Sequence, residues 1–130
     1  MKKYLLIFVL TLATFASAMA KGGVEFRDGA LDDMVAEAAA EEKYLFVELF
    51  ATWCGPCRML MPVLDELAKE YAGKVDIYKV NVEDEQQLAE EFGIRSIPTL
   101  LFIPKQGLPQ TRLGAMQKSQ LREVFDRMAQ

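Results

Sequence analysis

The sequence predicts a three-layer α/β fold in which helices cover both faces of a mixed central sheet. Short apolar runs alternate with amphipathic helical patterns along the chain, one helix connects the first two of these runs, and a short turn connects the last two. A helical crossover joins parallel strands, whereas a short turn joins antiparallel ones. The sheet is therefore expected to contain both kinds of strand pair.

The first half of the domain is predicted as helix, strand, helix and strand. Residues 30–42 space their apolar side chains as one helical face, and residues 44–51 form a short aromatic and branched run typical of a buried strand. A second helix follows the cysteines, ends at Gly73 and contains Pro62, which should kink it. A strand over residues 75–82 completes this half.

The second half is predicted as a short helix, a hairpin and a last helix. The helix covers residues 85–92 and ends at Gly93. A strand over residues 99–103 then turns back into a short strand at 110–113, because prolines and a glycine separate the two runs. Residues 119–128 place their apolar side chains on one face of a final amphipathic helix.

The first twenty residues have the pattern of a secretory signal peptide. Lys2 and Lys3 precede an apolar run, and small residues at 18–20 offer a cleavage site after Ala18 or after Ala20. The apolar run is shorter than the roughly 20 residues that cross a bilayer. We therefore expect cleavage, with no stable membrane insertion, and a mature protein in the periplasm or outside the cell.

The composition is that of one globular domain, residues 21–130, since 52% of the 130 residues are hydrophobic and 26% are charged. Loss of the signal removes two of the 15 basic residues and none of the 19 acidic ones, which leaves a formal charge of −6. This balance argues against nucleic acid or an anionic membrane as a partner. We expect a monomer.

The two cysteines are expected to form a redox-active dithiol. They lie in the sequence Trp53-Cys54-Gly55-Pro56-Cys57, and a bridge across so small a loop removes little chain entropy. Disulfide exchange needs one thiolate to attack and a second thiol to resolve the mixed disulfide. Cys54 should attack, because at an exposed helix N-terminus the backbone N–H groups and the dipole favour a negative sulfur.

The other residues of this motif suit the same chemistry. Cys57 should be buried one turn further on and act as the resolving thiol, Pro56 fits the first helical turn, and Gly55 lets a substrate backbone approach. Zinc would want four Cys or His ligands, whereas this chain has two Cys and no His, and haem attachment would need His where Arg58 stands. No metal or other cofactor is expected, and an inert structural bridge remains the alternative.

The chain from Phe46 through the last helix resembles the thioredoxin family in its secreted form. The resemblance rests on the cysteine motif, on Pro62, on the segment Gly93-Ile94-Arg95-Ser96-Ile97-Pro98-Thr99, and on Gly107 and Gly114. It implies the thioredoxin fold, with a cis peptide before Pro98 and with Pro98, Ile97 and Trp53 shaping a peptide groove beside the sulfurs. The sequence by itself shows only an Ile-Pro step, for which trans is the commoner state.

Glu48 departs from the family pattern, because thioredoxins usually carry Asp six residues before the first cysteine. Alternation places Glu48 on the same side of its strand as Phe46 and Phe50, and Phe50 stands where thioredoxins often have Trp. A carboxylate buried there should have a raised pKa and accept the proton of the resolving thiol. Lys79 matches the family lysine near that acid. Alternatively, both side chains are solvated.

These residues predict a thiol-disulfide oxidoreductase that reduces proteins outside the cytoplasm. Its partners would be protein disulfides and a membrane or soluble thiol that donates electrons. An oxidant, an isomerase or a non-catalytic binding module with permanently oxidised cysteines remain alternatives. Trp53 is expected to be a partly exposed apolar flank for the substrate chain, with simple packing as the alternative. No role is assigned to the acidic run at 83–85, which is interpreted as solvated surface.

Overall fold

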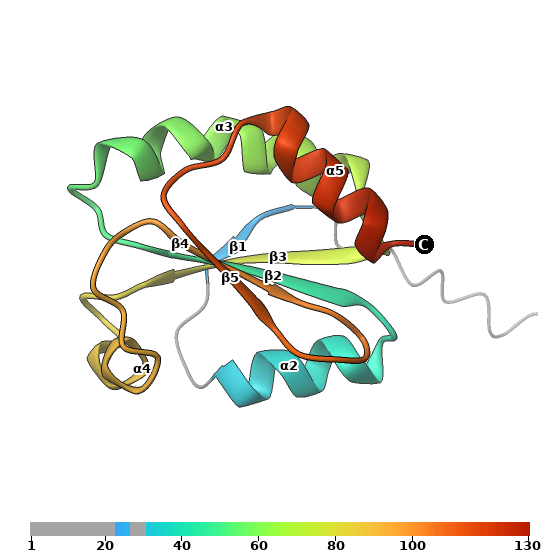
Figure 1. Ribbon diagram of the computed structural model, residues 1–130, viewed down its shortest axis with the longest axis horizontal. Coiled ribbons are helices and arrows are strands. Elements are labelled where there is room, and N and C mark those ends of the chain that lie inside the picture. The colour runs from blue at the N-terminus through green and yellow to red at the C-terminus, as the bar shows by residue number, and fades with distance from the viewer. Residues whose placement is uncertain (1–22, 27–30) are drawn as a thin grey trace, which may run out of the picture.

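Helices cover both faces of a five-stranded sheet whose strand order is β1-β3-β2-β4-β5. The computed structural model describes residues 23–26 and 31–130, so the predicted signal peptide lies outside the described residues. Helices α3 and α5 lie on one face of the sheet, and α2 and α4 lie on the other (Figure 1). This arrangement confirms the three-layer α/β prediction.

The sheet is mixed, as the connections predicted. Strands β1 (Glu25–Phe26), β2 (Tyr44–Phe50) and β3 (Val75–Asn81) are parallel to one another, with β3 in the middle of the three. Strands β4 (Thr99–Ile103) and β5 (Gln110–Leu113) continue the sheet beside β2 in antiparallel pairs. β1 was not predicted, because two residues are too few to display a period of two.

The helices begin and end close to the predicted residues. They are α2 (Leu31–Ala40), α3 (Gly55–Glu70), α4 (Gln86–Glu91) and α5 (Lys118–Met128). Helix α3 was expected to end at Gly73 but stops at Glu70. Helix α2 was expected to reach Glu42 but stops at residue 40, because Glu42 has a φ of 56° that a right-handed helix does not accommodate. None of the described helices is long and apolar enough to span a membrane.

Pro62 lies inside α3, yet the helix continues through it without interruption. Proline has no N–H to donate, so the carbonyl of Arg58, four residues earlier, loses its usual helical partner. The apolar face of α3 packs against the sheet on both sides of this position, with Leu60 and Leu64 fully buried. Packing therefore holds the helix where its backbone bonding is weakest.

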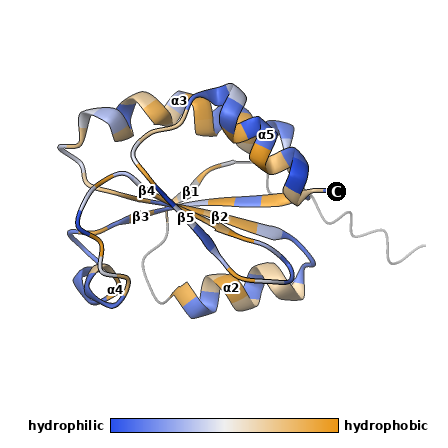
Figure 2. Cartoon of the chain, viewed as in Figure 1, coloured by the Kyte–Doolittle hydropathy of each residue, from blue (hydrophilic) through white to orange (hydrophobic). Residues whose placement is uncertain are grey.

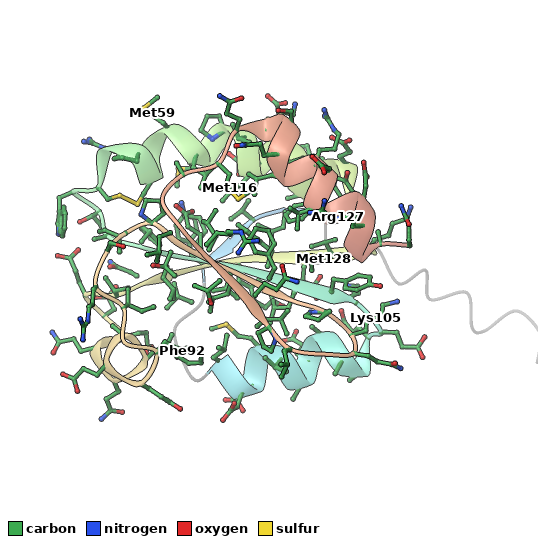
Figure 3. The ribbon with its side chains drawn as sticks, viewed as in Figure 1. Met59, Phe92, Lys105, Met116, Arg127 and Met128 are labelled. Carbon is green, nitrogen blue, oxygen red and sulfur yellow. A yellow bond between two sulfur atoms is a disulfide. The ribbon has the colours of Figure 1, made fainter. Side chains whose placement is uncertain are left out.

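Two apolar cores flank the sheet, and β2 contributes to both by strict alternation. Phe46 packs between the sheet and helices α3 and α5, whereas Leu45, Val47 and Leu49 pack toward α2 and α4. Figure 2 shows hydrophobic residues along the strands and on the sheet-facing sides of the helices, with hydrophilic ones outside. In Figure 3 Met59 projects from α3 into solvent, and it is 78% exposed.

Phe125 of α5 is the centre of an aromatic cluster in the core beneath α3. Its ring lies 5.3 Å from those of Phe46 and Tyr71 and 6.3 Å from that of Phe102, all in edge-to-face arrangements. Such pairs add to the free energy gained from burying apolar area. The cluster attaches the last helix to the first long strand, β2, and to α3.

We predict that Phe125→Ala lowers the free energy of unfolding by about 3–5 kcal/mol, because it removes a fully buried ring and leaves a cavity. Urea denaturation of the purified protein measures the change. Phe92→Ala is the matched control, since that ring is 45% exposed, and it should cost about 1 kcal/mol or less. Equal losses in the two variants would contradict the assignment of Phe125 to the core.

Candidate active site

The candidate active site lies at the edge of the sheet where β2 and β3 both end. The chain leaves β2 into residues 51–54 and leaves β3 into residues 82–85, and the segment before β4 approaches from the antiparallel side. Loops that follow neighbouring parallel strands meet at the same edge. Figure 1 shows these loops at one end of the molecule, next to the start of α3.

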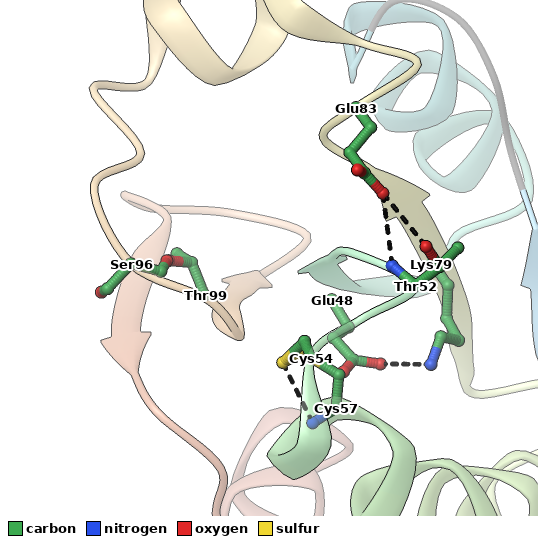
Figure 4. The surroundings of a disulfide bond; sticks show 8 residues. All are labelled: Glu48, Thr52, Cys54, Cys57, Lys79, Glu83, Ser96 and Thr99. Atoms are coloured by element: carbon green, nitrogen blue, oxygen red, sulfur yellow. Dashed lines mark hydrogen bonds and ion pairs between the residues drawn. A yellow bond between two sulfur atoms is a disulfide. The ribbon is translucent and has the colours of Figure 1, made fainter.

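Cys54 and Cys57 form a disulfide at the N-terminus of α3, with sulfurs 2.06 Å apart and Cα atoms 5.3 Å apart. Cys54 is the N-cap residue, and its Sγ accepts a hydrogen bond from the backbone N–H of Cys57 at 3.3 Å (Figure 4). Pro56 lies in the first turn, as predicted. The N–H and the helix dipole would both stabilise a negative charge on this sulfur.

The burial of the two cysteines differs less than predicted. Cys57 is 1% exposed, but Cys54, which was expected to be exposed at the helix end, is only 4% exposed. The expectation was wrong for this disulfide form because the Sγ of Cys54 turns inward to the Cys57 N–H. Gly55 is exposed, and a Cβ there would meet no atom within 4 Å, so packing within the chain does not require glycine.

Glu48 is completely buried beneath this disulfide and forms an ion pair with Lys79, which is 1% exposed. The two residues are register partners on β2 and β3, and Glu48 Oε2 lies 2.8 Å from Lys79 Nζ. That contact lacks hydrogen-bond geometry, and among the residues that the structure describes neither carboxylate oxygen has a hydrogen-bond partner. Burial raises the pKa of Glu48, and the nearby ammonium of Lys79 offsets this only in part.

Two aromatic rings complete the surroundings of Lys79. Its Nζ lies 4.5 Å from the ring centre of Phe50 and 5.8 Å from that of Phe26, and the two rings contact each other edge to face at 5.9 Å. A buried ammonium gains from such rings because their faces are electron-rich. A cavity of about 500 Å³ lies against Phe26, Phe50, Lys79 and Cys57. Phe26 was missed, because it belongs to the strand too short to predict.

Two of the predicted groove residues, Trp53 and Ile97, come together at one cavity. The Ile97-Pro98 peptide is cis, as the resemblance implied, Pro98 is buried, and Ile97 is half-buried. Trp53 is 68% exposed and, with Ile97, lines a cavity of about 350 Å³ between the cysteine loop and α4. The Pro98 carbonyl accepts a hydrogen bond from Gly114 N at 2.8 Å, which ties this segment to the end of β5.

Glu83 is a second residue of this site, besides Phe26, whose contacts the sequence did not reveal. It was interpreted as solvated acidic surface, yet its carboxylate accepts hydrogen bonds from Trp53 Nε1 at 3.1 Å and from Thr52 Oγ1 at 3.2 Å. The backbone N–H of Thr52 donates to it as well, at 3.4 Å. An acidic residue in an acidic run carries no signal of such contacts, because they join segments about 30 residues apart.

The site contains no obvious set of metal ligands. Within residues 23–26 and 31–130, no three side chains of the His, Cys, Asp and Glu types gather in a way that would hold an ion. The groups that the fold does bring together are a cysteine pair at a helix N-terminus, a buried acid paired with a lysine, and a cis-proline segment. They define the class of protein as a thiol-disulfide oxidoreductase.

Comparison with known proteins identifies the family. The thioredoxin family profile matches residues 24–127. A thioredoxin from Haemophilus influenzae is 53% identical over 77 residues, which are 59% of this chain and 72% of that protein. A chloroplastic M-type thioredoxin from Pisum sativum is 42% identical over 100 residues, 77% of this chain but 56% of that longer protein.

Solved structures agree with this assignment. A chloroplastic thioredoxin z is 30% identical with a TM-score of 0.73, and the match covers 82% of this chain and 94% of that one. The chain therefore belongs to the thioredoxin family, and it is an enzyme of the protein disulfide reductase type that this family represents.

We predict that Glu48→Gln changes how stability depends on pH. A carboxyl group whose pKa is raised in the folded state contributes stability below its unfolded pKa and loses it as pH rises through the folded pKa. The free energy of unfolding of the wild type minus that of the variant should therefore fall with rising pH, by about 1.4 kcal/mol per unit of pKa elevation.

Urea denaturation of the disulfide form at a series of pH values measures this difference. Glu91→Gln is the matched control, because it makes the same change at an exposed residue, and a pH dependence shared by the two variants would not be due to the burial of Glu48. A Glu48→Gln difference that rises with pH would show that Glu48 is ionised at low cost in the folded protein.

Proposed function

We propose that the protein reduces disulfides of other proteins outside the cytoplasm, with Cys54 as the attacking thiol and Cys57 as the resolving thiol. The observation that carries this proposal is the hydrogen bond from the Cys57 N–H to Cys54 Sγ at the start of α3. The same donor would stabilise the Cys54 thiolate, and the thiolate is the form that attacks a disulfide.

In the first step the Cys54 thiolate attacks one sulfur of a substrate disulfide. A sulfur-sulfur bond forms between Cys54 and the substrate, the substrate bond breaks, and the other substrate sulfur leaves as a thiolate. Trp53, the residue before Cys54, has an exposed ring that lines one cavity with Ile97. In this proposal these side chains and Pro98 border the approach to Cys54 and offer an apolar surface for the substrate chain.

In the second step the Cys57 thiol loses its proton and attacks Cys54 Sγ in the mixed disulfide. This forms the Cys54–Cys57 disulfide that the structure contains and releases the second substrate sulfur as a thiolate, so two electrons have passed to the substrate. Glu48 is the proton acceptor in this proposal. Its buried position raises its pKa toward the range in which a carboxylate is an effective base.

Lys79 has a positioning part in this step. Its ammonium keeps the carboxylate of Glu48 ionised often enough to accept a proton, and the rings of Phe26 and Phe50 hold the ammonium in place. The cavity beside Cys57 and Lys79 gives water a route to the Glu48–Lys79 pair. By this route the proton that Glu48 accepts can return to solvent.

The proposed location rests on residues 1–20, whose basic start, apolar run and small residues have the pattern of a signal peptide. An oxidising compartment would keep the cysteine pair in its disulfide form. A thiol donor in the membrane or in solution must therefore return two electrons to the pair after each cycle.

We predict that Cys57→Ser accumulates mixed disulfides with substrate proteins through Cys54, because the resolving thiol is absent. Non-reducing electrophoresis and mass spectrometry identify the bridged cysteine. Cys54→Ser is the matched control and should trap little or nothing. Adducts through Cys57 in the control, with none through Cys54, would reverse the assigned order of attack.

We predict that the full chain, expressed in a bacterium with a periplasm, is recovered there with its mature end at residue 21 or at residue 19. Cell fractionation and the intact mass of the protein measure this. A chain that begins at residue 21 is the control and should stay in the cytoplasm. Cytoplasmic full chain that retains residues 1–20 would contradict the proposed location.

The reducing direction is tested by the reduction potential of the purified mature domain. A potential near −270 mV, about that of thioredoxins, supports a reductant, whereas one near −120 mV marks a strong oxidant. If the cysteine pair cannot be reduced and reoxidised at any potential in this range, the result would instead favour a binding module with a permanent disulfide.

A further inference from the structure

Glu83 connects two loops of the active site that are far apart in the sequence. It lies two residues beyond the end of β3, while its hydrogen-bond partners Thr52 and Trp53 lie between β2 and the cysteines. One carboxylate oxygen accepts from the Trp53 indole and the other accepts from the Thr52 hydroxyl and N–H. Figure 4 shows the contact with Thr52.

The position of Glu83 is itself restrained. Its backbone N–H donates to Asn81 Oδ1 at 3.0 Å, and the Val82 N–H donates to the Phe50 carbonyl at 2.9 Å. The segment after β3 is thus attached to the end of β2 just before the cysteine loop. A carboxylate held in this way can hold other groups in turn.

Trp53 needs such a restraint because little else holds its ring. The side chain is 68% exposed, so packing against the protein contributes little, and an exposed ring would otherwise sample several rotamers. The hydrogen bond from Nε1 to Glu83 selects an orientation in which the indole forms a wall of the cavity next to Ile97 and Ile94.

We propose that Glu83 is a positioning residue that orients Trp53 for protein substrates and thereby lowers KM for them without taking part in the exchange chemistry. This inference rests on the proposed function, in which Trp53 borders the approach to Cys54. Because the Trp53 ring is already ordered in the free protein, substrate binding does not carry the entropic cost of ordering that ring. A small disulfide that reaches Cys54 without contacting the ring gains nothing from Glu83.

The test compares the wild type with Glu83→Gln, using insulin as the protein disulfide, hydroxyethyl disulfide as the small one, and dithiothreitol as the electron source. With one strong acceptor lost, KM for insulin should rise about fivefold while kcat stays unchanged. The rate with hydroxyethyl disulfide and the reduction potential should also stay unchanged. Glu91→Gln, the same change at an exposed residue on α4, should leave every value at that of the wild type.

Fluorescence provides a second readout, because Trp53 is the only tryptophan in the sequence. In the fully reduced protein, Glu83→Gln should lower the steady-state anisotropy of this ring, since its hydrogen bond to the carboxylate is weakened. In a Trp53→Phe background, Glu83→Gln should change KM for insulin by less than about twofold, because the group that it orients is absent.

Each outcome decides the proposal. It is supported if Glu83→Gln raises KM for insulin, leaves the rate with hydroxyethyl disulfide unchanged and lowers the anisotropy of Trp53. An unchanged KM overturns it, and so does an equal loss with both disulfides, which would mean damage to the cysteine site. Wild-type protein that fails to reduce insulin at all would instead refute the proposed function. Thermal unfolding of each variant identifies any loss of folded protein.

Discussion

The parallel pairing of β2 with β3 is the constraint on which the rest of the site depends. Its register places Glu48 opposite Lys79, and its shared end brings the cysteine loop beside the loop that carries Glu83. Parallel strands require a long crossover, and α3 is that crossover, so the helix whose N-terminus holds the cysteines is also the helix that makes the pairing possible. The cysteines, the buried acid and the Trp53 contact are therefore consequences of one topology.

Burying the Glu48–Lys79 ion pair beneath the cysteines costs desolvation free energy, and this cost bears on the role of Glu48. Moving the charged groups of Glu48 and Lys79 out of water costs several kcal/mol for each ion. Their mutual attraction offsets this cost only when the geometry is good and further hydrogen bonds are present. Within residues 23–26 and 31–130, neither carboxylate oxygen has a hydrogen-bond partner, and besides Glu48 two aromatic rings lie near the Lys79 ammonium. The pair is a weak source of stability, which agrees with the proposed use of Glu48 as a proton acceptor.

Much of the fold could be predicted from local patterns. Strands β4 and β5 begin and end where the sequence indicated, because each is a clear apolar or extended run bounded by turn residues. The contacts of Glu83 and Phe26 could not be predicted, because they depend on segments that meet only in the folded chain. The burial of Cys54 also escaped prediction, since a helix N-terminus is usually open to solvent.

The sequence by itself determined the cysteine motif, its place at a helix start, the side of its strand on which Glu48 lies and the order of the helices and of strands β2 to β5. These properties follow from residue spacing, and spacing is local. Only the tertiary structure decided that Lys79 pairs with Glu48, that the Ile97-Pro98 peptide is cis and that Glu83 holds Trp53. Such features depend on which segments become neighbours, and the free energy that selects them comes from burial and pairing across the whole domain.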